Sequence, residues 1–101
     1  ALAAHQLWRD SNGREGARLE LRGIDLSEAI FDGKDFSGAD FRGARLDRAQ
    51  MKKAKLIATD LRDASMAGTD FRDADLRGAL VSENGLARAV LDGAQIDGRP
   101  G

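Results

Sequence analysis

The chain is poor in several residue types that carry chemistry in other proteins. Among its 101 residues there is no cysteine and no tyrosine, and there is one proline, one histidine and one tryptophan. Without cysteine there is no disulfide framework and no thiolate chemistry, which suits a reducing compartment. The single histidine, His5, could serve as a proton shuttle or a metal ligand, but it has no ligand cluster around it in the sequence, so we expect a polar position on a short capping helix. The sequence therefore predicts no metal site and no cofactor.

Long apolar runs and an excess of one charge are also absent. No run approaches the roughly 18 apolar residues that span a bilayer, and no signal peptide is visible, so we expect no membrane span and a cytoplasmic location. Lys and Arg number 16 against 17 Asp and Glu, which gives a net charge of −1. A chain this close to neutrality has no overall field that would select nucleic acid or a membrane surface. Its length leaves room for a single core.

What the sequence does contain is an internal repeat of period five. Between residues 19 and 98 a large apolar side chain falls on every fifth position, and all four Phe and both Met of the protein belong to this column. Its sixteen members are Leu21, Leu26, Phe31, Phe36, Phe41, Leu46, Met51, Leu56, Leu61, Met66, Phe71, Leu76, Val81, Leu86, Leu91 and Ile96. Two positions before most of them stands a small residue, Ala or Thr. A fixed period of this kind indicates a repeat architecture.

The period of five excludes both regular secondary structures. In a helix this column would run around the whole cylinder and leave no apolar stripe. In one long strand, residues five apart would fall on opposite faces. The pattern instead predicts a chain that turns a corner every five residues and directs one large and one small side chain inward per segment. Stacked coils of such a chain can pair their backbones about 4.8 Å apart, as sheet strands do.

The motifs of the repeat resemble those of the pentapeptide-repeat family. Ala-Asp-Phe-Arg-Gly at 39–43, Thr-Asp-Phe-Arg-Asp at 69–73 and Ala-Asp-Leu-Arg-Gly at 74–78 carry this resemblance, which extends over residues 19–98. The family implies an all-β solenoid in the form of a right-handed quadrilateral β-helix with four repeats per coil. On that basis the sixteen repeats make about four coils, a rod of roughly 19 Å.

The segments outside the repeat are short. We expect residues 1–18 to form a capping helix over 1–9 followed by a turn, and residues 99–101 to form a C-terminal tail. Repeat proteins need their terminal coils covered. The last coil has no bulky plug after it, so this end is a candidate for an end-to-end homodimer.

The expected cap places Leu7 and Trp8 over the first coil. Its expected neighbours there are Leu19, Leu21, Ile24 and Leu26. The alternative is a linker helix whose apolar face docks elsewhere.

Glycines that recur two positions after the large column favour corners of the coil, and Asn84-Gly85 is typical of a modified turn.

Any functional surface must use the outward positions, because the inward ones are occupied by packing. Stacking by twenty residues places Arg22, Arg42 and Arg62 in one file, two residues from a file of Glu20, Asp40 and Asp60. The simpler interpretation is a solvated face of weak ion pairs, worth about 0–1 kcal/mol each. The sharper hypothesis is a surface that recognises a charged protein partner of unknown identity.

A run of basic residues, here called the basic waist, is a second candidate surface. It consists of Arg45, Arg48, Lys52, Lys53 and Lys55. Five charges spread around about half a coil make a poor footprint for nucleic acid, and no aromatic side chain is interleaved to stack on bases. We therefore do not expect nucleic acid as a partner.

No catalytic constellation is present, because the carboxylates follow the repeat spacing and no base accompanies a serine. We therefore do not expect the protein to be an enzyme.

Two function classes remain. The first is a structural or protein-interaction module that presents a rigid β-helical surface, alone or within a larger protein. The second comes from the resemblance, because some family members mimic duplex DNA and bind gyrase. A 19 Å mimic of DNA would need about eleven net negative charges, and this chain has a net charge of −1.

Overall fold

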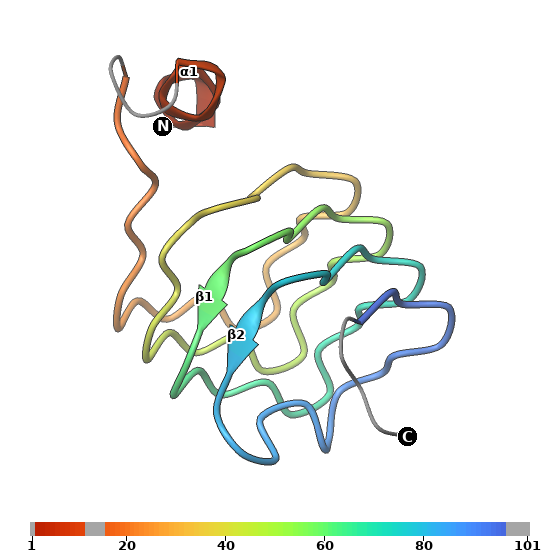
Figure 1. The fold of residues 1–101 in the computed structure, drawn as a ribbon. Coiled ribbons are helices and arrows are strands. Elements are labelled where there is room, and N and C mark those ends of the chain that lie inside the picture. Colours follow the sequence, from red (N-terminus) through yellow and green to blue (C-terminus); the bar gives the residue numbers. More distant parts are fainter. Residues whose placement is uncertain (1, 12–15, 97–101) are drawn as a thin grey trace.

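The computed structural model describes residues 2–11 and 16–96 (Figure 1). The helix α1 (Leu2–Asp10) precedes a stack of irregular coils, in which two short strands occur, β1 (Asp60–Leu61) and β2 (Leu80–Val81). The expected tail at 99–101 lies outside the described residues, as do the end of the last repeat at 97–98 and most of the turn after the helix at 12–15.

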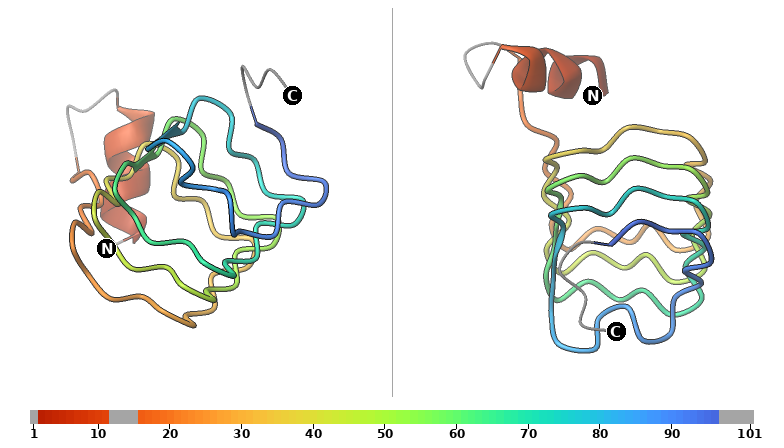
Figure 2. Two further views of the ribbon diagram at one scale, coloured as in Figure 1. Left: turned by 90° about the horizontal axis from the view of Figure 1, so that it is seen from below. Right: turned by 45° about the vertical axis from the view of Figure 1, so that its right-hand side comes forward.

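The coils are joined in parallel register. Strands β1 and β2 pair Asp60 with Leu80 and Leu61 with Val81. Ten further parallel bridges also join residues that lie twenty apart, from Glu20 with Asp40 to Asp75 with Gln95. One turn of the coil therefore takes twenty residues, or four repeats. The successive turns lie one behind another along a common axis, with α1 at the N-terminal end of the stack (Figure 2).

Outside the interrupted stretch at 81–88, the described repeats turn their corners in the same way. The N–H of a small-column residue donates to the carbonyl oxygen of the large residue three positions earlier, as Ala44 does to Phe41 at 3.0 Å. The second of the two residues between them has a positive φ, 69° at Gly43. The corner is therefore a type II turn, which favours glycine at this position. The same conformation occurs where the sequence has no glycine: at Glu28, Arg48, Lys53, Ala58, Asp63 and Asp73.

We expect Ala58→Gly to stabilise the protein, because Ala58 has a φ of 58°. A left-handed conformation costs an L-residue roughly 1–2 kcal/mol, and glycine avoids this cost. Glycine also makes the unfolded chain more flexible, which offsets about 0.5–1 kcal/mol of the gain in stability. The free energy of unfolding in urea should rise by up to about 1 kcal/mol. The matched control is Ala67→Gly, one residue before a corner, which should lower stability by about 0.5–1 kcal/mol. Equal losses in both variants would contradict this explanation of the corners.

The inward columns form one continuous core. Phe41, Leu61 and Phe71 of the inner coils are completely buried, whereas Val81 of the last coil is 37% exposed. The small column also contributes hydrogen bonds, because the buried hydroxyl of Thr69 donates to the carbonyl oxygen of Leu46 at 2.7 Å. Burial therefore decreases toward the two ends of the stack, although Phe36 of the first coil and Leu86 of the last coil are still buried.

The helix α1 lies against the first coil at a different place from the one expected. Trp8 lies beside the corner at Gly38, where a Cβ would stand 3.3 Å from its ring. Leu7 is 46% exposed and Ile24 is 42% exposed, so the predicted cover of this part of the coil by Leu7 is wrong. The helix instead packs Leu2 against the core and makes polar contacts near Gly38, which leaves Leu7 toward solvent.

The main polar contact of α1 is His5, the most buried residue of the helix. Its Nδ1 accepts a hydrogen bond from the N–H of Leu19 at 2.8 Å, and its Nε2 lies 2.8 Å from the carbonyl oxygen of Ser37. Arg9 adds an ion pair with Asp35 at 2.7 Å. His5 is therefore a polar position on the helix, as expected, but a fully buried one, and its ring links the helix to both ends of the first coil.

Candidate interaction surface

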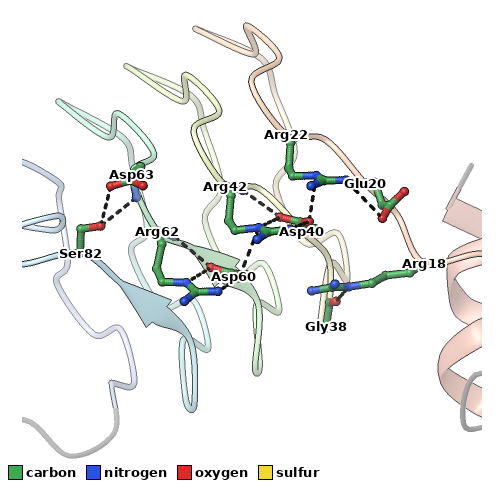
Figure 3. Close-up of polar contacts among 10 residues, drawn as sticks. All are labelled: Arg18, Glu20, Arg22, Gly38, Asp40, Arg42, Asp60, Arg62, Asp63 and Ser82. Carbon is green, nitrogen blue, oxygen red and sulfur yellow. Dashed lines mark hydrogen bonds and ion pairs between the residues drawn. The ribbon is translucent and has the colours of Figure 1, made fainter.

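The two predicted files of charge lie side by side on one face of the coil stack, and together they are here called the charge ladder (Figure 3). The ladder consists of Glu20, Arg22, Asp40, Arg42, Asp60 and Arg62. The backbone explains its order, because Glu20 is paired with Asp40 and Asp40 with Asp60 through parallel bridges. Each arginine follows its acid by two residues, so both side chains leave the same side of the backbone.

Asp40 is the centre of the charge ladder. Its side chain is 1% exposed, and Arg42 binds it with two hydrogen bonds, Nε to Oδ1 at 3.0 Å and Nη2 to Oδ2 at 2.9 Å. The N–H of Arg42 also donates to Oδ1 at 3.1 Å. Arg22 of the preceding coil approaches Oδ2 to 3.3 Å. A buried carboxylate is tolerated here because cations and an amide satisfy its oxygen atoms.

Asp60 repeats this arrangement one coil further on. Arg62 binds it through Nε at 2.9 Å and Nη2 at 2.7 Å. Arg42 lies 3.7 Å from Asp60, so this arginine links two successive carboxylates. The ladder thus runs without interruption from Arg22 to Arg62.

The carboxylates of the ladder are held in their charged form. Hydrogen bonds from Arg42 lower the pKa of Asp40 from its ordinary value of 3.8 to about 2, although burial of the carboxylate acts in the opposite direction. Arg62 lowers the pKa of Asp60 in the same way. The same bonds raise the pKa of Arg42 and of Arg62. The pairs therefore remain ionised at neutral pH.

The sequence pattern of the ladder occurs twice more, and these two pairs are absent from the predicted site. Arg72 binds Asp70 through Nη2 at 2.7 Å, and Arg77 binds Asp75 at 2.6 Å. The signal that could have found them is Asp-x-Arg at the start of a repeat, which both share with Asp40 and Asp60. The Asp–Arg pair therefore follows from the repeat motif itself and also forms outside the face that carries the charge ladder.

The basic waist does not gather into one patch. Arg45 and Arg48 belong to one repeat, Lys52 and Lys53 to the next, and Lys55 to a third, so they leave the coil at successive corners and segments. Their charges also meet acids of adjacent coils. Arg48 forms an ion pair with Glu28 at 3.1 Å, and Lys55 lies between Asp35 and Asp75 in the parallel register.

Across residues 2–11 and 16–96 there is no cluster of three or more potential metal ligands. Within that same part of the chain, the helix is too short and too polar to cross a membrane. The buried acids of the charge ladder are already bound by its own arginines. Contact of the ladder or of the basic waist with a partner stays a prediction.

A parallel coil with a twenty-residue turn and an inward column every fifth residue defines a β-helical repeat protein. The model of the pentapeptide-repeat family matches the chain in eight copies, over residues 20–56 and 54–81. The chain belongs to this family, whose members fold as right-handed β-helices. No catalytic family is indicated, and comparison with curated proteins gave no match.

Solved structures of the same family are similar to this chain. The pentapeptide repeat protein alr5209 from Nostoc Pcc 7120 is 29% identical, with a TM-score of 0.71 over 93% of this chain and 73% of that one. Rfr23 from the cyanobacterium Cyanothece 51142 is 19% identical, with a TM-score of 0.43 over 95% and 96% of the two chains. A pentapeptide repeat protein of the Arabidopsis thaliana thylakoid lumen is 28% identical, with a TM-score of 0.35 over 75% and 60%.

Proposed function

We propose that the protein is a non-catalytic interaction module: a four-coil quadrilateral β-helix that is capped at one end by α1 and binds a partner with its last coil. The observation that carries this proposal is the unpaired edge of that coil. In the inner coils the N–H groups of Phe71 and Asp73 donate to Val90 and Asp92 at 2.9 and 3.0 Å. Among the described residues no acceptor faces the corresponding N–H groups of Leu91 and Gly93.

The last coil also opens into a hollow at the end of the core. The hollow has a volume of about 390 Å³ and is lined by Val81, Ser82, Asn84, Gly85, Leu86, Ala87 and Leu91. It arises where the repeat is interrupted, because Asn84 takes a positive φ of 62° and the described structure has no bridge between positions 65 and 85. Apolar side chains beside free backbone groups are what an added strand requires.

The partner that this end fits is a second copy of the chain. The edge of the last coil offers both donors and acceptors for strand pairing. In the described part of the chain, the N–H groups of Leu91 and Gly93 and the carbonyl groups of Ala89 and Ala94 have no backbone partner. A surface that offers donors and acceptors in the same edge is self-complementary, which is the requirement of a two-fold dimer. Two such ends would also bury Val81, which is 37% exposed.

The mass in solution tests this proposal, by sedimentation equilibrium at micromolar to millimolar protein. We expect a species of twice the 10.8 kDa chain mass. Val81→Lys should return the protein to a monomer, because it places a charge at the mouth of the hollow. The matched control is Ile24→Lys, a similarly exposed apolar residue at the other end, which should leave the dimer intact. A monomeric native protein at all concentrations would reject the homodimer.

The alternative of a DNA mimic that binds gyrase receives no support from the geometry. A mimic must present uncompensated negative charge, whereas Asp40 and Asp60 are buried and bound by arginines. Failure of the protein to inhibit gyrase supercoiling at micromolar concentration would remove this alternative.

A further inference from the structure

The buried ring of His5 is held in one protonation state by its two partners. The side chain is 0% exposed and stacks on Trp8, with ring centroids 5.7 Å apart. The amide of Leu19 can only donate, so Nδ1, at 2.8 Å, carries no proton. The carbonyl oxygen of Ser37 can only accept, so Nε2, also at 2.8 Å, must carry one. The contacts thus assign a neutral imidazole with its proton on Nε2.

The ring takes the place of a backbone amide that a preceding coil would supply. Within the stack, Gly23 donates its N–H to the carbonyl oxygen of Arg42 at 3.0 Å, and Gly33 donates to that of Lys52 at 2.9 Å. The carbonyl of Ser37 occupies the equivalent position in the first coil, where no such amide reaches it. His5 supplies the donor instead. The histidine is therefore the residue that joins α1 to the edge of the β-helix.

The charged groups nearest this contact are already paired or hydrogen-bonded. Arg9 of α1 lies next to the contact and is paired with Asp35 at 2.7 Å. Arg18 of the first coil donates to the carbonyl oxygen of Gly38 at 2.7 Å, one residue beyond Ser37. Burial raises the pKa of Asp35, but the N–H of Ser37 and the Arg9 guanidinium outweigh it and lower that pKa overall. Asp35 therefore stays anionic and already paired in mild acid.

We propose that His5 is a pH-sensitive latch, and that taking up a proton releases α1 from the first coil. Protonated Nδ1 becomes a donor that faces the donating amide of Leu19, so one hydrogen bond is lost and a positive charge is left on a fully buried ring. Because protonation costs the docked state this hydrogen bond and costs the released state nothing, acid shifts the equilibrium toward release. Release exposes the carbonyl of Ser37 and the edge of the first coil. The latch depends on the docked position of α1 and not on the dimer proposed for the last coil.

Trp8 is the only tryptophan of the protein, so its fluorescence reports the position of α1 directly. On titration from pH 8 to pH 4.5 we expect a reversible red shift of its emission as the ring leaves Gly38 for water. The circular dichroism of the coils should not change over this range, because ordinary carboxylates titrate near pH 4. An emission maximum that stays constant to pH 4.5 would overturn the proposal.

Two variants and one spectroscopic measurement separate the latch from other effects of acid. His5→Gln cannot titrate, so its emission should be independent of pH, whether α1 is docked or not. Arg9→Gln removes the ion pair with Asp35 and should weaken docking equally from pH 5 to pH 8. NMR of labelled histidine in the native protein should show the Nε2–H tautomer at pH 8 and protonation at the midpoint of the Trp8 transition. A ring that remains neutral through that transition, or a His5→Gln variant that titrates like the native protein, would refute the latch.

Discussion

Replacement of Phe71 by alanine is expected to lower the free energy of unfolding by about 3–5 kcal/mol, the range found for large-to-small changes of buried aromatic residues. Phe71 is 0% exposed. The coils around it are fixed in position, because the N–H of Met51 is bound to Asp70 at 2.8 Å and that of Phe71 to Val90 at 2.9 Å. A backbone tied on both sides cannot move inward to fill the space, so the cost should be at the upper end. Denaturation in urea measures it.

The matched control for this prediction is Phe31→Ala. Phe31 belongs to the same inward file two coils earlier, but it lies in the first coil and is only partly buried. Its ring contacts Phe36 edge to face with centroids 5.0 Å apart, so some stability is still lost. We expect a loss of roughly half that of Phe71→Ala, because less apolar area leaves water. Equal losses would mean that the stack is not the rigid frame described here.

These two phenylalanines also show how far the sequence predicts the fold. A period of five is incompatible with a helix or a flat strand, and it was enough to identify the core column and, with the family resemblance, the coil. It does not distinguish Phe31 from Phe71, since both occupy the same position of their repeats. Their difference in burial comes from the number of neighbouring coils, which is a property of the assembled stack.

The corners and the helix show what the sequence pattern left open. Glycine predicts a positive φ, but Ala58 and Lys53 adopt the same conformation because the hydrogen-bonded coils impose it. His5 has no signature at all, because its partners are the backbone of Leu19 and Ser37, far away in the sequence. Backbone partners carry no residue identity, so a single sequence gives no means to find them.

The stacking of the two charge files could be predicted from the sequence, but their internal contacts could not, and their role as a binding surface stays a prediction. Stacking by twenty places the two files correctly side by side, yet each acid is bound mainly by the arginine of its own repeat, as Asp40 is by Arg42. The five members of the basic waist are close together in the sequence. In a chain that turns every five residues, closeness in sequence does not mean closeness on one surface.

The charge ladder makes stability depend on pH, and Asp40→Asn is the variant that isolates this effect. The pKa of Asp40 is lowered to about 2 in the folded protein, whereas an unfolded aspartate titrates near 3.9. The native pair therefore contributes its full stability above about pH 4. As the pH falls, the unfolded chain takes up the proton first, and the contribution disappears by about pH 2.

We expect Asp40→Asn to be less stable than the native protein at pH 7 by about 1–2 kcal/mol, a value reduced from the full linkage because the arginines are half exposed. The difference should shrink between pH 4 and pH 2, since the native carboxyl is then also neutral. Urea midpoints at pH 7, 4 and 2.5 measure this change. Asp92→Asn is the control, because Asp92 is exposed and forms no ion pair within the described structure; it should have a small effect at every pH. A loss in Asp40→Asn that stayed constant down to pH 2.5 would mean that Asp40 acts through its shape and its hydrogen bonds rather than through its charge.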